Sequence, residues 1–148
     1  MILHLGVIDQ PYTPPPRRGR SKTRTVTTGD VAGWLETRYH VMEVFAQEHA
    51  ADIASDIEQS LTGTIQSLLM GAPPSIDAFG AATSAIEQRF RQFIDTKEME
   101  RLGYPGVPTQ AALMGVSHRF KRPYVRRPPR PSFQDTGLYE TSFKAWVD

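Results

Sequence analysis

The stretch SLLMGAPPSIDAF, from Ser67 to Phe79, decides the fold, because it ends one long helical pattern and begins another. Gly71 and the pair Pro73-Pro74 do not continue a helix, so the chain must turn there. Before the turn apolar residues recur at helical spacing over about 40 residues, and after it they step by three and four. This pattern predicts an antiparallel helical hairpin whose connection runs from Gly71 to Pro74.

The first helix is expected to begin near Asp30, where Thr27 and Thr28 offer capping oxygens. Its apolar stripe predicts one helix, which would be about 60 Å long if unbroken. Gly63 is the expected position of a bend. The stripe consists of Val31, Leu35, Met42, Phe45, Ile53, Ile57, Leu61, Ile65 and Leu68.

The second helix is expected to follow Ser75, a good capping residue, and to end before Gly103. Its three phenylalanines share one edge and need an apolar wall, for which the stripe of the first helix is the simplest source. The residues on this edge are Ile76, Phe79, Thr83, Ile86, Phe90 and Phe93.

The two ends of the chain favour strands. Residues 1–8 alternate, with Leu3, Leu5 and Val7 on one side, and residues 143–147 follow an expected short helical turn. Pairing of these strands gives an α+β fold, mainly α, in which a helical hairpin core carries a small β element and extended basic arms. The expected divisions are 1–29 (strand and basic arm), 30–102 (hairpin), 103–135 (second basic arm) and 136–148 (turn and strand).

The net charge of +1 hides a separation of charge along the chain. Residues 1–29 and 102–148 each carry +4, whereas residues 30–101 carry −7. The bases cluster with prolines, which keep such stretches extended. Three uses are open: contact with acidic surfaces of neighbouring proteins, which the charge pattern favours; contact with DNA; and a solvated linker. The bases concerned are Arg17, Arg18, Arg20, Lys22, Arg24, Arg119, Lys121, Arg122, Arg126, Arg127 and Arg130.

No pattern in the chain predicts catalysis, a metal or a cofactor. The triplet Asp135-Thr136-Gly137 occurs in aspartic proteases, but the sequence around it favours a simple turn. The four histidines fit no compact ligand spacing, and cysteine is absent. Acidic residues on the first helix are interpreted as a solvated face or a docking surface for a basic arm: Glu43, Glu48, Asp52, Asp56 and Glu58. No run approaches the roughly 20 apolar residues of a membrane span, and no secretory signal is recognised.

The segment from Pro131 to Val147, PSFQDTGLYETSFKAWV, resembles the closing segment of tailed-phage neck and tail-completion proteins. Their pattern is an Asp-Thr-Gly turn, a leucine, a serine four residues later and a terminal apolar strand. Asp135, Thr136, Gly137, Leu138 and Ser142 stand at the matching positions.

The resemblance implies a structural virion protein, not an enzyme, that is assembled in the host cytoplasm. It implies a homo-oligomeric ring in the head-to-tail connector, with portal, neck and tail proteins as partners, and with packaged DNA as a further candidate. The alternative is a small nucleic-acid-binding protein whose basic arms track phosphates. The side chains expected to dock as apolar anchors are Phe133, Leu138, Tyr139, Phe143 and Trp146.

Overall fold

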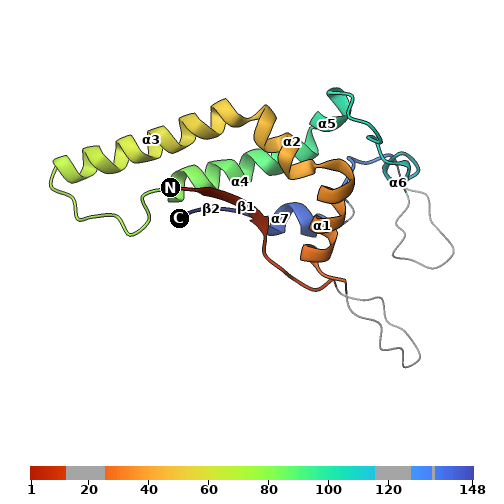
Figure 1. Ribbon diagram of the computed structural model, residues 1–148, viewed down its shortest axis with the longest axis horizontal. Helices are drawn as coiled ribbons and strands as arrows, with labels where there is room; N and C mark the ends of the chain where they lie inside the picture. The colour runs from red at the N-terminus through yellow and green to blue at the C-terminus, as the bar shows by residue number, and fades with distance from the viewer. Residues whose placement is uncertain (13–25, 116–127, 135) are drawn as a thin grey trace.

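The computed structural model describes residues 1–12, 26–115, 128–134 and 136–148, which form a mainly helical chain with one small sheet (Figure 1). The expected α+β class with helices predominating is confirmed. None of the described helices is long and apolar enough to cross a membrane. The elements are β1 (Leu3–Val7), α1 (Thr28–Tyr39), α2 (Val41–Glu48), α3 (Ala50–Leu69), α4 (Gly80–Asp95), α5 (Glu98–Arg101), α6 (Gln110–Leu113), α7 (Leu138–Ser142) and β2 (Phe143–Val147).

The two ends of the chain form the sheet, as the sequence predicts. β1 and β2 pair antiparallel, with Leu5 opposite Ala145 and His4 opposite Trp146. Because side chains alternate between the faces of a strand, Leu5 and Ala145 share the inner face with the other odd-numbered residues. β2 packs against α4 on this side (Figure 1).

The expected single helix between residues 30 and 70 is wrong, because the chain breaks at His40 and bends at His49. His40 has φ 53° and ψ 43°, a left-handed conformation that ends α1. At His49, with φ −105°, the helical hydrogen bonds continue: its N–H donates to Phe45 and its carbonyl accepts from Ile53. α1 therefore turns away from the line of α2 and α3 (Figure 1).

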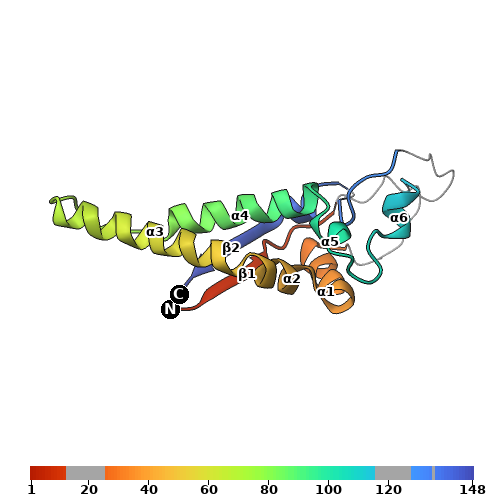
Figure 2. The ribbon, with the colours of Figure 1, turned by 90° about the horizontal axis from the view of Figure 1, so that it is seen from above.

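The antiparallel hairpin is confirmed for α3 and α4, which lie side by side (Figures 1 and 2). Its connection is longer than expected, because α4 begins at Gly80 and Ser75 does not cap it. The Ser75 hydroxyl accepts from the Asp77 N–H, and the Asp77 carboxylate accepts from the Phe79 N–H. These local turns fix the backbone ahead of the helix.

An aromatic cluster joins the hairpin to the sheet. Phe90 of α4 stacks on Phe143 of β2, with ring centroids 3.8 Å apart, and Phe45 of α2 meets Phe90 edge-on at 5.1 Å. All three are fully buried, and Phe93 and Tyr139 pack beside them. The apolar wall opposite the phenylalanines is therefore built by β2 as well as by the first part of the hairpin.

The N-terminal strand is tied to the start of α1 through Thr28. Thr27 caps this helix in a capping box with Asp30. The helix therefore starts close to Asp30, where the sequence predicts it. The buried Thr28 hydroxyl donates to the Ile8 carbonyl at 2.6 Å and accepts from the Gln10 N–H at 2.8 Å. One side chain thus satisfies backbone groups on either side of Asp9.

Replacing Thr28 by valine should lower the free energy of unfolding by roughly 2 kcal/mol, because it leaves two backbone groups without their partner. Urea denaturation measures the change. Thr37→Val is the matched control, since the Thr37 hydroxyl donates to the Gly33 carbonyl on the exposed side of α1 and its loss should have little effect. Equal losses for the two variants would contradict this role of Thr28.

The span 103–135, expected to be an extended arm, packs on the core in its described parts. Val107 and Ala112 are buried, and residues Gln110–Leu113 form the short helix α6. The buried Ser132 hydroxyl donates to Glu100 at 2.8 Å and accepts from the Thr109 N–H at 3.1 Å. The core therefore includes residues beyond 102. They come from both sides of residues 116–127: Val107 and Ala112 before them, and Ser132 after them.

Candidate interaction surfaces

Most of the basic residues expected to contact a partner lie outside the described residues. Arg130 is described, and its guanidinium donates to the Gln134 carbonyl within the same chain. The others are Arg17, Arg18, Arg20, Lys22, Arg24, Arg119, Lys121, Arg122, Arg126 and Arg127.

The residues that flank each basic stretch are held together. The Tyr12 N–H donates to the Val26 carbonyl at 3.0 Å, so the described residues on either side of 13–25 lie together. The Arg130 N–H donates to the Ala112 carbonyl at 3.2 Å on the flanks of residues 116–127. Both pairs lie at the α1 and α6 end of the molecule, opposite the turn between α3 and α4 (Figure 1). We call this end the basic end, a name that refers only to the described residues that flank the two basic stretches.

Most of the expected apolar anchors are used within the chain itself. Tyr139 and Phe143 are fully or almost fully buried in the core, so their surface is not available to a neighbour. Phe133 packs on the same core against Tyr39, and Leu138 is half-buried at the start of α7. Trp146 is 47% exposed and is the member of the set with a large free surface.

The turn of the hairpin carries an exposed apolar surface that the sequence reasoning missed. α3 is longer than α4, and its last turns extend past its neighbour (Figure 2). Leu69 and Met70 are 83% and 88% exposed. The sequence held a signal for this surface: Leu69 and Met70 are apolar, stand directly before Gly71 and are not part of the apolar stripe of the helix. We call this surface the hairpin tip: Ile65, Leu68, Leu69, Met70 and Ile76.

The acidic side of the first helical segment is partly neutralised within the chain. Arg89 of α4 binds Asp52 at 3.3 Å and Asp56 at 2.9 Å. Glu43 pairs with His40, and Glu48 accepts a hydrogen bond from the Tyr104 hydroxyl at 3.4 Å. The Arg89 pairs with Asp52 and Asp56 leave less free negative charge for a basic stretch of a neighbour than the sequence suggests.

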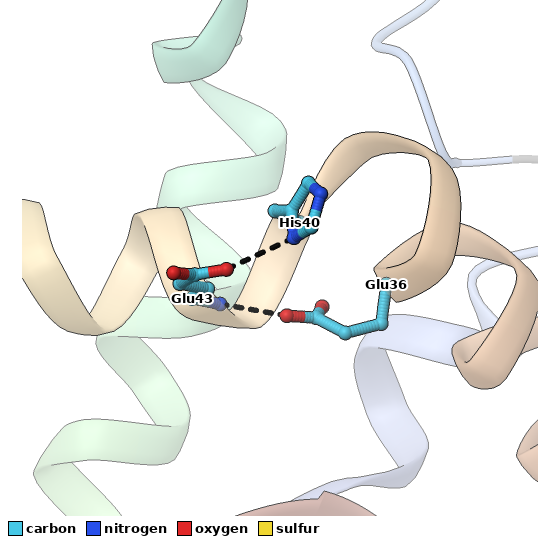
Figure 3. Close-up of side chains that lie close together, drawn as sticks. All are labelled: Glu36, His40 and Glu43. Carbon is cyan, nitrogen blue, oxygen red and sulfur yellow. Dashed lines mark hydrogen bonds and ion pairs between the residues drawn. The ribbon is translucent and has the colours of Figure 1, made fainter.

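Glu36, His40 and Glu43 gather at the break between α1 and α2 (Figure 3) and could offer ligand atoms to a metal ion. The geometry has a structural explanation without one. Both Glu36 oxygens accept backbone bonds, from the Met42 N–H at 2.8 Å and the Glu43 N–H at 3.1 Å, and so cap α2. His40 Nδ1 lies 2.9 Å from the Glu43 carboxylate, which fixes the turn further.

Replacing Glu36 by alanine should lower the free energy of unfolding by about 1 kcal/mol, because two N–H groups at the start of α2 lose their acceptor. Glu36→Gln should lose about half as much, since its amide oxygen still accepts one bond. Thermal unfolding with and without divalent metal checks this. A metal-dependent rise of the melting temperature in the wild type, lost in both variants, would instead make the cluster a metal site.

The titratable groups with shifted pKa values form no accessible site. Burial raises the pKa of Tyr139, whose hydroxyl has no hydrogen-bond partner among the described residues. Burial also raises the pKa of Glu140, while hydrogen bonds from Gln134 act in the opposite direction. The hollow lined by Phe93, Met99 and Phe133 has a volume of about 10 Å³, room for roughly one water. Neither Tyr139 nor Glu140 lines this hollow.

Comparison of the chain with protein-family models, with curated proteins and with solved structures gave no match. Its function is therefore argued from its own surfaces. These are the basic end, the hairpin tip at the opposite end, and the outer face of the terminal sheet around Trp146.

Proposed function

We propose that this protein is a structural virion protein of a tailed phage, a ring-forming subunit of the neck that joins the capsid portal to the tail. It is assembled in the host cytoplasm and acts through contacts with copies of itself and with other neck, portal or tail proteins, not through catalysis. The observation that carries the proposal is the two-ended protomer, with basic stretches flanked at one end and an exposed apolar tip at the other.

A protomer with unlike ends suits head-to-tail contacts. A heterologous contact joins one surface of a subunit to a different surface of the next, and such contacts close into a ring when the rotation permits. Five apolar side chains at the hairpin tip are left in water by the chain's own fold. Burial of such a surface against the neighbouring subunit contributes about 25 cal/mol per Å² to a ring, from which the entropic cost of association is subtracted.

The closing segment also supports the proposal. Gly137 is left-handed at φ 74° and precedes α7, whose end continues directly into β2. The Thr136 hydroxyl accepts from the Leu138 N–H at 3.3 Å, so the turn of the phage-like pattern is held by its own side chain. Asp135 lies outside the described residues. The segment thus belongs to the core of the subunit. It would hold the terminal sheet in place when the subunit is part of a ring.

The basic end favours one rival function, a small nucleic-acid-binding protein, because the flanks of both basic stretches lie there. Binding to duplex and single-stranded DNA across a salt series separates the two. A neck subunit should show no micromolar affinity at physiological salt. Micromolar binding that falls steeply and linearly in a log-log plot against salt would favour the rival.

The neck assignment is tested by mass spectrometry of purified particles of the phage that encodes the chain. The protein should be recovered from particles that have been banded in a density gradient and treated with nuclease. Its presence in the infected cells but absence from such particles would contradict the proposal.

A further inference from the structure

β1 has one edge without a hydrogen-bonding partner among the described residues. The N–H groups of Ile2 and Ile8 donate to the β2 side, each at 2.8 Å. Backbone groups alternate in direction along an antiparallel strand, so those of Leu3, Leu5 and Val7 point away from β2. A free edge of this kind is a template for another strand.

The opposite edge of the sheet is closed by α4. The Ala145 N–H, which points away from β1, lies 3.5 Å from a carboxylate oxygen of Glu87. The other oxygen of Glu87 binds the Lys144 ammonium at 2.8 Å. A charged pair on this edge hinders strand pairing, so the sheet cannot extend head to tail from a β1 edge to a β2 edge. An added strand pairs with β1.

The β1 sequence is nearly symmetric about Leu5. It reads ILHLGVI from Ile2 to Ile8, with apolar residues at equal distances on both sides of the centre. An antiparallel pair centred on Leu5 puts Ile2 opposite Ile8 of the second copy and Leu3 opposite Val7. It also puts His4 opposite Gly6, which has no side chain to compete for space. The strand is therefore complementary to itself in this register.

The outer face beside this edge is apolar and exposed. Ile2 and Ile8 are 62% and 47% exposed, although both lie on a short sheet. Trp146 stacks on His4 with ring centroids 5.2 Å apart and lies flat across Gly6, where a Cβ atom would be 3.1 Å from the indole ring. A second copy would extend this face and cover its apolar margin.

We propose that the free protein forms a twofold dimer in which β1 pairs antiparallel with β1 of a second copy, centred on Leu5, to give a four-stranded sheet. About six backbone hydrogen bonds would cross the interface. The dimer does not rest on the neck assignment. A twofold contact cannot join neighbours that share one direction around a ring, so the dimer would dissociate before its subunits enter a single ring.

Light scattering coupled to gel filtration tests the proposal on the full chain. The wild type should elute as a dimer at micromolar concentration, and a monomer would overturn the proposal. The double variant Ile2→Lys with Ile8→Lys should weaken dimerisation about tenfold or more, because it places like charges opposite each other twice in the interface. Both side chains are exposed, so the far-ultraviolet circular dichroism spectrum should be unchanged, and the melting temperature should fall only by the amount that the loss of the dimer accounts for.

A charge swap tests the register. Ile2→Glu with Ile8→Lys places opposite charges across the interface and should restore the dimer. Leu69→Lys with Met70→Lys, which adds the same charge at the hairpin tip, is the matched control and should leave the dimer intact. A dimer lost in the control but kept in the Ile2 and Ile8 lysine variant would overturn the proposal, as would failure of the charge swap to restore it.

Discussion

Replacing Phe90 by alanine should lower the free energy of unfolding by about 4 kcal/mol, a large part of the total for a domain of this size. Phe90 is fully buried and contacts both α2 and β2, which are far apart in sequence. It stacks on Phe143 of β2 and meets Phe45 of α2, so its loss opens a cavity between the hairpin and the sheet. Urea denaturation followed by circular dichroism measures the effect.

Trp34→Ala is the control for this prediction. Trp34 is also a large aromatic residue on a helix, but it is 61% exposed. Its removal should change the free energy of unfolding by less than about 1 kcal/mol. Similar losses for Phe90→Ala and Trp34→Ala would show that the aromatic cluster is not the centre of the core.

Introducing Leu69→Asp and Met70→Asp together should abolish incorporation of the protein into particles, while two carboxylates at the C-terminal end of α3 lower the free energy of unfolding by only about 1 kcal/mol. Both side chains lie at the hairpin tip and are more than four-fifths exposed, at 83% and 88%, so the chain itself does not need them. A subunit contact built on this surface would have to bury two carboxylates, which costs several kcal/mol. Complementation of a deletion phage, scored by plaque titre and by the protein content of particles, measures the effect.

Gln66→Asp with Ser67→Asp is the matched control for the hairpin tip. These positions lie on the same last turns of α3, are exposed and polar, and receive the same added charge. We expect near-normal titre from this variant. Normal titre from the Leu69 and Met70 variant would show that the hairpin tip makes no essential contact in the particle.

The elements that follow from local patterns could be predicted from the sequence. Alternation at residues 1–8 indicated an N-terminal strand and residues 143–147 were expected to form a second one, and the structure pairs them. Gly71 and the two prolines that follow marked the hairpin turn, because their backbone restrictions hold in any context. The capping oxygens of Thr27 and Thr28 marked the start of α1 to within a few residues.

The breaks in the first helix could not be predicted, because no glycine or proline marks them. His40 adopts a left-handed conformation that is uncommon for a residue with a side chain. It is held there by Glu36, which reaches across the turn to two N–H groups of α2. Such a contact depends on the three-dimensional path of the chain. The apolar periodicity of the sequence continues across the break at His40, since Met42 and Phe45 still face the core.

The candidate surfaces were predicted less well than the fold. The apolar residues of the closing segment looked like anchors for a neighbour, but Tyr139 and Phe143 complete the chain's own small core. The hairpin tip was hidden in the helical stripe, since Ile65 and Leu68 continue its spacing past the point where α4 can cover them. Burial depends on the relative lengths of α3 and α4, and periodicity does not report it.

The most direct test of the central claim is a reconstruction of the neck of the phage particle at a resolution that shows helices. We predict a closed ring of this chain between portal and tail, identified by the paired α3 and α4 beside a small terminal sheet, with the hairpin tip of each subunit against the next. A neck map whose every ring is accounted for by other chains would contradict the account.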